Sequence, residues 1–454
     1  MCGFQNEKEK RREMKRLILI TLMVFTILPV NYSWAGEIDD LRDEVRRLRE
    51  DYETKIDRLQ DQIDMLTKKQ RQQIAQIEEK VDKRMLDVEY VGRYEGPFKK
   101  GGLLIKHHTG SGNVSVGGYV DMEYEDFENS NSTFDQHRWV MNVGAELNDR
   151  LKFYSEYELE HGGPDGNNSG DGEAKVEQAW MDYLINNAIN FRVGGLLVPF
   201  GRYNLFHDSD LQDLTDRPLV AKEVIPSTWT EAGAGFHGEF NPVIGGYEDL
   251  MLGYEFYVIN GLDGVSDTGL SKGSLKSDNN NSKAGVARLV ISPFVGHELG
   301  LSGYRGKYGA GEDNITGGAI DWFSTWGPVE IVGEAAHFKV DANSIDTVSN
   351  FFTGYYIQGN YRFWPEFLNN TFLGRDFEDP TLTLVARHGW VTIDDDDSDA
   401  DTIDNEEERF TFGFNYRPVE SWVMKFEYQW NNTDGETLQR GSNDGFIASV
   451  AMGF

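Results

Sequence analysis

One irregular segment of the chain, residues 200–228, concentrates charged side chains of both signs. Its acids are Asp208, Asp210, Asp213, Asp216 and Glu223, and its bases are Arg202, Arg217 and Lys222. Opposite charges that face each other across a narrow, partly desolvated passage create a transverse field, which orders water, favours polar solutes and slows apolar ones. This charge pattern therefore predicts that the segment selects solutes and does not catalyse a reaction.

Residue patterns for catalysis are missing from the sequence. The nine histidines are scattered, and none lies in a Gly-x-Ser-x-Gly or His-Glu-x-x-His context. Cys2 is the sole cysteine and lies outside the expected mature chain, so disulfides, thiolate chemistry and c-type haem are not expected. We therefore expect no enzyme, no catalytic residue, no cofactor and no metal centre. An outer-membrane lipase or protease is the competing class, and enzyme assays on the purified protein would identify it.

Acidic residues outnumber basic ones in the chain as a whole, which has a formal net charge of −32. This charge argues against nucleic acid as a partner. The densest acidic run covers Asp394–Asp397, Asp399, Asp401, Asp404 and Glu406–Glu408. It lacks the glycine-centred spacing of a calcium loop, so we interpret it as a solvated charge run and keep Ca²⁺ or Mg²⁺ binding as the alternative.

Residues 1–35 are expected to be a secretory signal peptide, with Met14 as the possible true start. Leu17–Leu28 is an apolar run of twelve residues, too short to span a bilayer as a helix, and Ser33-Trp34-Ala35 is a small-x-small cleavage site. An uncleaved membrane anchor is the alternative. No later segment offers eighteen consecutive apolar residues, so an exported chain of this kind is either soluble or a β-barrel.

Residues 36–87 carry a heptad pattern. Ile38, Leu41, Val45 and Leu48 begin a 3-4-3 spacing that recurs from Ile56 and from Ile74, with a four-four step between the first two groups. This spacing predicts a coiled coil with one stutter, and a lone amphipathic helix is the alternative. Residues 88–112 hold seven glycines and prolines, which indicates a flexible linker.

From residue 113 to residue 454 the apolar period changes to two. Strands with one apolar and one ionisable face need lipid or core on one side and water on the other. We expect sixteen strands, near 113–127, 134–148, 150–161, 173–186, 189–199, 229–240, 249–260, 283–292, 297–306, 314–325, 328–339, 351–363, 380–391, 406–417, 421–432 and 443–454. Short turns alternate with long polar segments, although the segment 364–379 is unexpectedly long. The pattern predicts an outer-membrane barrel, with a soluble β-sandwich as the alternative.

The ionisable face of these strands should line the lumen. The basic lumen-wall residues singled out are Arg138, Lys152, Arg192, Arg362 and Arg387, with Arg288 and Lys425 in the same set. Its acids include Glu123, Glu146, Glu156, Glu158, Glu255 and Glu427. We expect the acids of 208–216 to face Arg138, Arg192 and Arg387 at the narrowest point. The alternative is that these charges are solvated, or form ion pairs that pin segment 200–228 to the wall. Aromatic residues near strand ends, Tyr154 and Trp180 among them, suit interfacial girdles.

The last strand alternates up to Phe454, which resembles the recognition signature of proteins inserted by the barrel-assembly machinery. Phe191–Arg202, in which a glycine-bearing strand enters a Pro-Phe-Gly turn, resembles the phosphate-selective porin O and P family within the general porin superfamily. The resemblance covers 113–454 and implies a homotrimer of passive channels in outer-membrane lipid, narrowed by the loop between the fifth and sixth strands. Some related porins carry an N-terminal periplasmic coiled coil.

The charge balance of 200–228 departs from that family. An anion path needs Lys and Arg, but acids outnumber bases in this segment, so phosphate specificity is not carried over. The predicted function is a porin for passive diffusion of ions and small polar solutes. The alternative is a barrel anchor whose coiled coil tethers the membrane to the cell wall or to a periplasmic partner, or a sheath for an electron carrier.

Overall fold

The computed structural model describes residues 35–82, 86–107, 112–164, 172–246, 248–266, 268–309, 312–341, 349–394, 404–435 and 442–454. The expected signal peptide and most of the acidic run at 395–403 lie outside these residues. The chain divides into two compact units, Met1–Asp82 and Lys83–Phe454.

The first unit contains one long helix, α2 (Ala35–Asp82). Residues 37–82 include neither glycine nor proline, and ion pairs one turn apart, such as Lys55–Asp51 at 2.7 Å, support the helix between residues 43 and 55. The seam residues are exposed within the single chain, with Leu41 at 64% and Leu59 at 57%. The helical extension is confirmed, and its pairing as a coiled coil stays a prediction. Among the described residues, no helix is both long and apolar enough to cross a bilayer.

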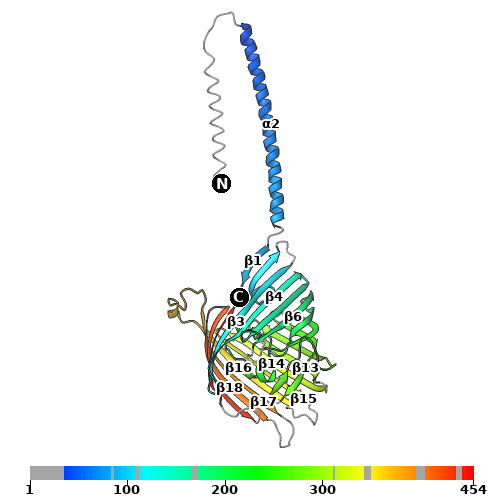
Figure 1. The fold of residues 1–454 in the computed structure, drawn as a ribbon, viewed down its shortest axis with the longest axis vertical. Helices are drawn as coiled ribbons and strands as arrows, with labels where there is room; N and C mark the ends of the chain where they lie inside the picture. Colours follow the sequence, from blue (N-terminus) through cyan, green and yellow to red (C-terminus); the bar gives the residue numbers. More distant parts are fainter. Residues whose placement is uncertain are drawn as a thin grey trace. The chain divides into compact units, whose positions relative to one another are not determined.

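The second unit is a closed antiparallel barrel, and the predicted fold of sixteen strands is confirmed (Figure 1). The strands are β3 (Asn113–Phe127), β4 (Thr133–Asn148), β5 (Leu151–Glu160), β6 (Glu173–Asn186), β7 (Ile189–Leu197), β8 (Thr230–Phe240), β9 (Met251–Ile259), β12 (Ala284–Phe294), β13 (His297–Tyr308), β14 (Asp313–Trp326), β15 (Val329–Val340), β16 (Phe351–Phe363), β17 (Thr381–Asp394), β18 (Asp404–Val419), β19 (Trp422–Gly435) and β20 (Gly445–Gly453). The barrel closes where β20 pairs with β3.

The barrel has one end with short turns and one end with long loops. Turns of two residues join β4 to β5 and β14 to β15, whereas 260–283 holds a small hairpin of β10 (Gly264–Ser266) and β11 (Gly269–Ser271). The long connection 364–380 is partly ordered by a 3₁₀ turn, η2 (Glu366–Leu368). Trp364 stacks on Tyr416 at 6.1 Å between ring centroids, and the Tyr416 hydroxyl donates to the carbonyl of Leu373. Contacts with Tyr416 of β18 therefore order part of this long connection.

The barrel wall has apolar side chains on its outer face and polar side chains on its inner face, the opposite of a soluble protein. Phe410, Phe412 and Phe414 of β18 are between 43% and 46% exposed on the outer face. Asn415 and Lys425 are buried inside, at 0% and 1% exposure. An apolar exterior around a polar interior is stable only when lipid surrounds the barrel. The girdle interpretation of Tyr154 and Trp180 is wrong, because both rings lie on the inner face and pack against Phe98.

Residues 86–107 differ from the expected flexible linker. They form a hairpin of β1 (Leu86–Val91) and β2 (Gly102–His107), and β2 pairs with the first residues of β3. Gly101 and Gly102 have φ of +71° and +90°, and a side chain on Gly102 would come within 2.4 Å of the carbonyl of Val116. The glycines therefore fix a tight turn against the wall rather than loosen the chain. We call residues 86–107 the N-terminal hairpin.

Candidate channel constriction

The connection between β7 and β8, residues 198–229, lies inside the barrel, and we call it the inner loop. Its two ends meet, since the Val198 amide donates to the carbonyl of Trp229 at 2.9 Å. Asn204 fastens this neck: its amide donates to Val198 at 2.8 Å and its carbonyl accepts from the Trp229 amide at 2.7 Å. Phe200 and Trp229 are fully buried and pack on Phe338 of β15. The neck is thus a rigid base from which the loop crosses the lumen.

Two acids of the inner loop bind basic groups of the wall between β16 and β19. The Asp213 carboxylate accepts from Asn360 at 2.8 Å and from Arg362 at 2.9 Å. Asp216 is paired with Arg409 at 2.5 Å, and its backbone carbonyl accepts from Arg387 at 2.8 Å. Although burial alone would raise the pKa of Asp216, the charges of Lys222 and Arg409 hold that pKa well below its usual range.

Asp208 and Asp210 of the inner loop bind the N-terminal hairpin instead of the barrel wall. Arg93 is paired with Asp208 at 2.6 Å and with Asp210 at 2.5 Å, and all three side chains are at least 97% buried. Lys100 also reaches Asp208, at 2.7 Å. Burial opposes ionisation of Asp208, but Lys100 and Arg93 lower its pKa well below the ordinary value. The hairpin tip and the inner loop are therefore joined by buried charges.

Backbone groups of the inner loop are held by wall side chains. The amides of Arg202 and Tyr203 donate to the Glu334 carboxylate at 2.6 and 2.8 Å. On the other side of the lumen, the Thr215 amide donates to Glu427 at 2.6 Å, and Lys425 donates to the carbonyl of Ser209 at 3.0 Å. Contacts with β15 at one end and β19 at the other fix the path of the loop across the barrel.

The basic residues predicted from the sequence lie on the inner face but have different partners. Arg362 and Arg387 bind the inner loop as described. Contrary to the expectation, Arg138 and Arg192 pair with acids of the wall and not with the acids of the loop. Arg138 lies beside Glu158 at 3.4 Å, and Arg192 pairs with Asp182 at 2.7 Å and covers the Trp180 ring. Each has an acid on the adjacent strand, and such cross-strand neighbours are nearer than the loop.

The remaining predicted bases have partners close by. Lys152 pairs with Glu146 at 2.7 Å across the β4–β5 turn. Arg202 pairs with Glu298 at 2.5 Å, and Arg217 donates to the carbonyl of Ser227 at 2.7 Å within the loop itself. The terminal Phe454 exchanges backbone hydrogen bonds with Gly118 where β20 ends. Its role in assembly stays a prediction.

Several residues that hold the inner loop escaped prediction. Arg93 and Lys100 belong to the segment interpreted as a linker. Arg409 and Arg417 were not selected among the lumen bases, although Arg417 donates to the loop carbonyls of Asp210 at 2.7 Å and Gln212 at 3.0 Å. His207 was also missed: it lies 3.5 Å from Glu177 and is buried. Burial opposes protonation of His207, yet the Glu177 charge raises its pKa to about 9. The only sequence signal for the hairpin residues was a pair of bases among glycines.

Cavities open on both sides of the inner loop. One of about 690 Å³ is lined by Phe98, Lys100, Trp180, Arg192 and Arg202, near the end with short turns. Another of about 490 Å³ is lined by Glu123, His137, Lys175, Asp216 and Lys222, near the long loops. Both contain charges of both signs. Among the described residues, Asp121, Glu123 and His137 form one group able to hold a metal ion.

The comparisons with known proteins agree with this geometry. Residues 112–324 match the model of the family described as phosphate-selective porin O and P. An uncharacterised protein of Aquifex aeolicus (strain VF5) is 28% identical over 215 residues, which are 44% of this chain. The match spans about half of that relative, at 47% of its length.

Among solved structures, OmpF of Salmonella typhi in complex with daunomycin has a TM-score of 0.52 at 12% identity, over 77% of this chain and 99% of that one. An anion-selective porin from Comamonas acidovorans has a TM-score of 0.48 at 11% identity, over 76% of this chain and 100% of that one. The likeness to OmpF shows that the two proteins share a barrel fold. The second unit is thus a closed barrel, and residues 112–324 carry the sequence pattern of the phosphate-selective porin O and P family.

Proposed function

We propose that the protein is a passive diffusion porin whose narrowest point is formed by the inner loop together with the tip of the N-terminal hairpin. The observation that carries the proposal is the crossing of the lumen by residues 202–217, anchored to Glu334 on one side and to Glu427 on the other. A loop held in this way leaves room for water and small polar solutes beside it, and it excludes larger ones.

The charges at this point support a channel without strong preference for either ion sign. Every acid of 208–216 has a basic partner, so little net charge faces the solute at the crossing. Phosphate specificity would need basic groups free to contact the anion. Arg93, Arg362 and Arg409 are instead bound to acids of the inner loop. We therefore propose small neutral and charged polar solutes as the substrates, with no catalysis by the barrel.

Thiol modification at the crossing tests this proposal directly. In a Cys2→Ser background, Gln212→Cys places one thiol in the inner loop, where Gln212 lines a cavity of about 290 Å³. We expect a charged methanethiosulfonate reagent to reduce the conductance of reconstituted channels by at least about half. Ser130→Cys, on an exposed loop between β3 and β4, is the control and should change little. Equal effects of the reagent on both variants would contradict the proposal.

We also propose that the porin is a homotrimer and that α2 lies in the periplasm, as the family resemblance implies. Light scattering of the detergent complex tests the trimer, and a mass of one or two chains would reject it. The exposed apolar seam of α2 supports the second candidate, in which the helix tethers the barrel to the cell wall or to a periplasmic partner. A purified protein that forms no channels but binds peptidoglycan through α2 would favour the tether.

A further inference from the structure

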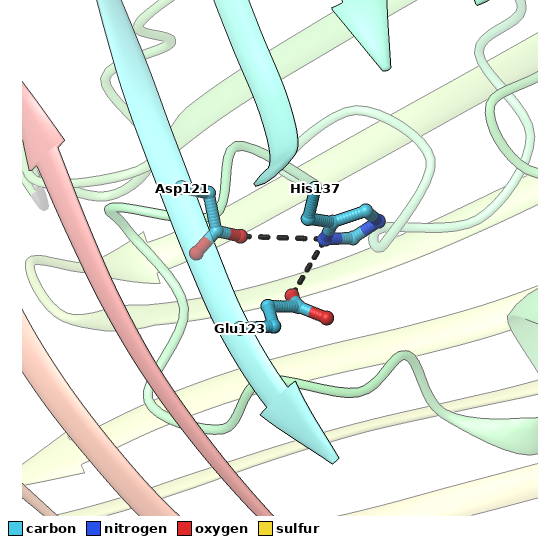
Figure 2. A group of neighbouring side chains, drawn as sticks. All are labelled: Asp121, Glu123 and His137. Carbon is cyan, nitrogen blue, oxygen red and sulfur yellow. Dashed lines mark hydrogen bonds and ion pairs between the residues drawn. The ribbon is translucent and has the colours of Figure 1, made fainter. Parts of the chain in front are cut away.

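Three potential metal ligands converge on the lumen face of the first two barrel strands (Figure 2). Asp121 and Glu123 come from β3 and His137 from β4. The Nδ1 atom of His137 lies 2.5 Å from Glu123 Oε1 and 3.4 Å from Asp121 Oδ2. One donor atom from each residue lies within 4.8 Å of the others. Ligands around one divalent cation are separated by about 3 Å, so small rotations of these side chains complete a three-ligand set.

A β-bulge aims His137 into the lumen. Asp121 pairs with Arg138, but Glu123 pairs with Asp135, so one extra residue lies in β4 between these positions. Without the bulge, His137 would point to the same outer face as Trp139. The bulge instead turns both His137 and Arg138 inward. Bulges that re-aim a side chain are frequent beside functional sites, because the local break in pairing has to be compensated.

Asp121 is the second, independent observation. Its side chain is 99% buried, and neither of its carboxylate oxygens accepts a hydrogen bond from the described residues. The neighbouring bases are directed elsewhere: Arg138 lies beside Glu158, and Lys425 donates to the carbonyl of Ser209. Burial of a carboxylate is costly unless the group is paired or coordinates a metal. The contact with His137 and the nearby Ser209 side chain leave part of this acceptor capacity unused.

We propose that Asp121, Glu123 and His137 bind one divalent transition-metal cation, of the class of Zn²⁺, on the lumen wall. One imidazole nitrogen with two carboxylate oxygens suits such ions, whereas Ca²⁺ and Mg²⁺ prefer oxygen ligands alone. Glu123 and His137 line the cavity of about 490 Å³, so the open coordination position faces water. The bound ion is accessible to solutes in the channel, and it adds positive charge beside the inner loop.

Calorimetric titration of the full-length protein in detergent with ZnCl₂ tests the site. We expect wild-type protein to bind one Zn²⁺ per chain at a site that weakens at least about tenfold in His137→Ala and in the isosteric Asp121→Asn. His237→Ala is the matched control, since His237 pairs with Asp182 at 3.2 Å elsewhere in the lumen and should leave binding unchanged. Wild-type affinity in both Asp121→Asn and His137→Ala would overturn the proposal.

Cobalt spectroscopy gives a second readout that needs no channel activity. Co²⁺ in a site with three protein ligands should show a visible absorption band that saturates at one ion per chain. The band should be lost in His137→Ala and in Glu123→Gln but kept in His237→Ala. A band that persists in both cluster variants would reject the site. Conductance without metal is measured on the same preparations, so a failed metal site is distinguished from a failed porin.

Discussion

The inner loop and the N-terminal hairpin enter the same lumen but differ in how they are held. The inner loop has a rigid neck, with Asn204 across its base, and binds several strands of the wall. The hairpin tip depends on Arg93 and Lys100, which bind the loop, and on Phe98, which packs on Tyr154 and Trp180. The loop is therefore held by the barrel alone at its neck, whereas the hairpin tip is held jointly by the barrel, through β3 and the rings of Tyr154 and Trp180, and by the buried acids of the loop.

Arg93→Ala should have the largest effect. It leaves Asp208 and Asp210 buried without their main partner, and loss of one member of a buried ion pair costs about 3–5 kcal/mol. Urea unfolding in detergent measures this loss, and single-channel noise should rise as the hairpin tip detaches. Lys99→Ala, an exposed neighbour in the same turn, is the control. An unfolding midpoint equal to that of wild type would show that the hairpin is not held by the loop.

The second-largest effect is expected at alkaline pH, which should lower the stability that His207 contributes to the inner loop. The pKa of His207 is raised to about 9, above the ordinary value of about 6.5, so the stability that it contributes is complete below pH 6.5 and is lost as pH rises through 9. The full shift corresponds to about 3 kcal/mol. Unfolding measured from pH 6 to pH 10 should show this decline in wild type but not in His207→Gln. An identical decline in both proteins would show that titrating groups other than His207 cause the loss of stability.

Phe98→Ala should have a smaller effect. The ring is half-buried between Tyr154, at 5.4 Å, and Trp180, at 6.2 Å, so its removal should cost about 2 kcal/mol and widen the cavity near the short turns. The conductance should rise while the contacts of the inner loop remain. Phe367→Ala, on a ring that is 77% exposed, serves as the comparison. If Phe98→Ala and wild type exclude polymers of the same sizes, Phe98 does not contribute to the narrowest point of the channel.

The smallest effect is expected for Arg192→Gln. Arg192 pairs with Asp182 on the adjacent strand and does not reach the inner loop, so its replacement should shift the reversal potential in a salt gradient by only a few millivolts. Asp213→Asn, which disturbs the crossing itself, should shift that potential more. A larger shift of the reversal potential for Arg192→Gln than for Asp213→Asn would show that Arg192 lies at the narrowest point of the channel.

The barrel could be predicted from the sequence because each strand carries its own alternating pattern. Three strands, β3, β6 and β16, begin and end at the predicted residues. The inner loop was also recognisable, as the longest irregular segment between two strands. Its partners were not, because Arg93 and Asp208 are 115 positions apart and no local pattern connects them. The hairpin was missed because glycines at positive φ resemble those of a flexible linker, and His137 was missed because a bulge breaks the alternation.

Single-channel conductance tests the central claim, that the inner loop limits passage through the barrel, most directly. Because Val198 and Trp229 are hydrogen-bonded neighbours, residues 201–227 can be replaced by a short Gly-Ser turn without separating the ends of β7 and β8. We predict stepwise open channels for wild type and a conductance at least about twice as large for the shortened protein. Equal conductance of the two proteins, or a wild-type barrel that never opens, would contradict the account.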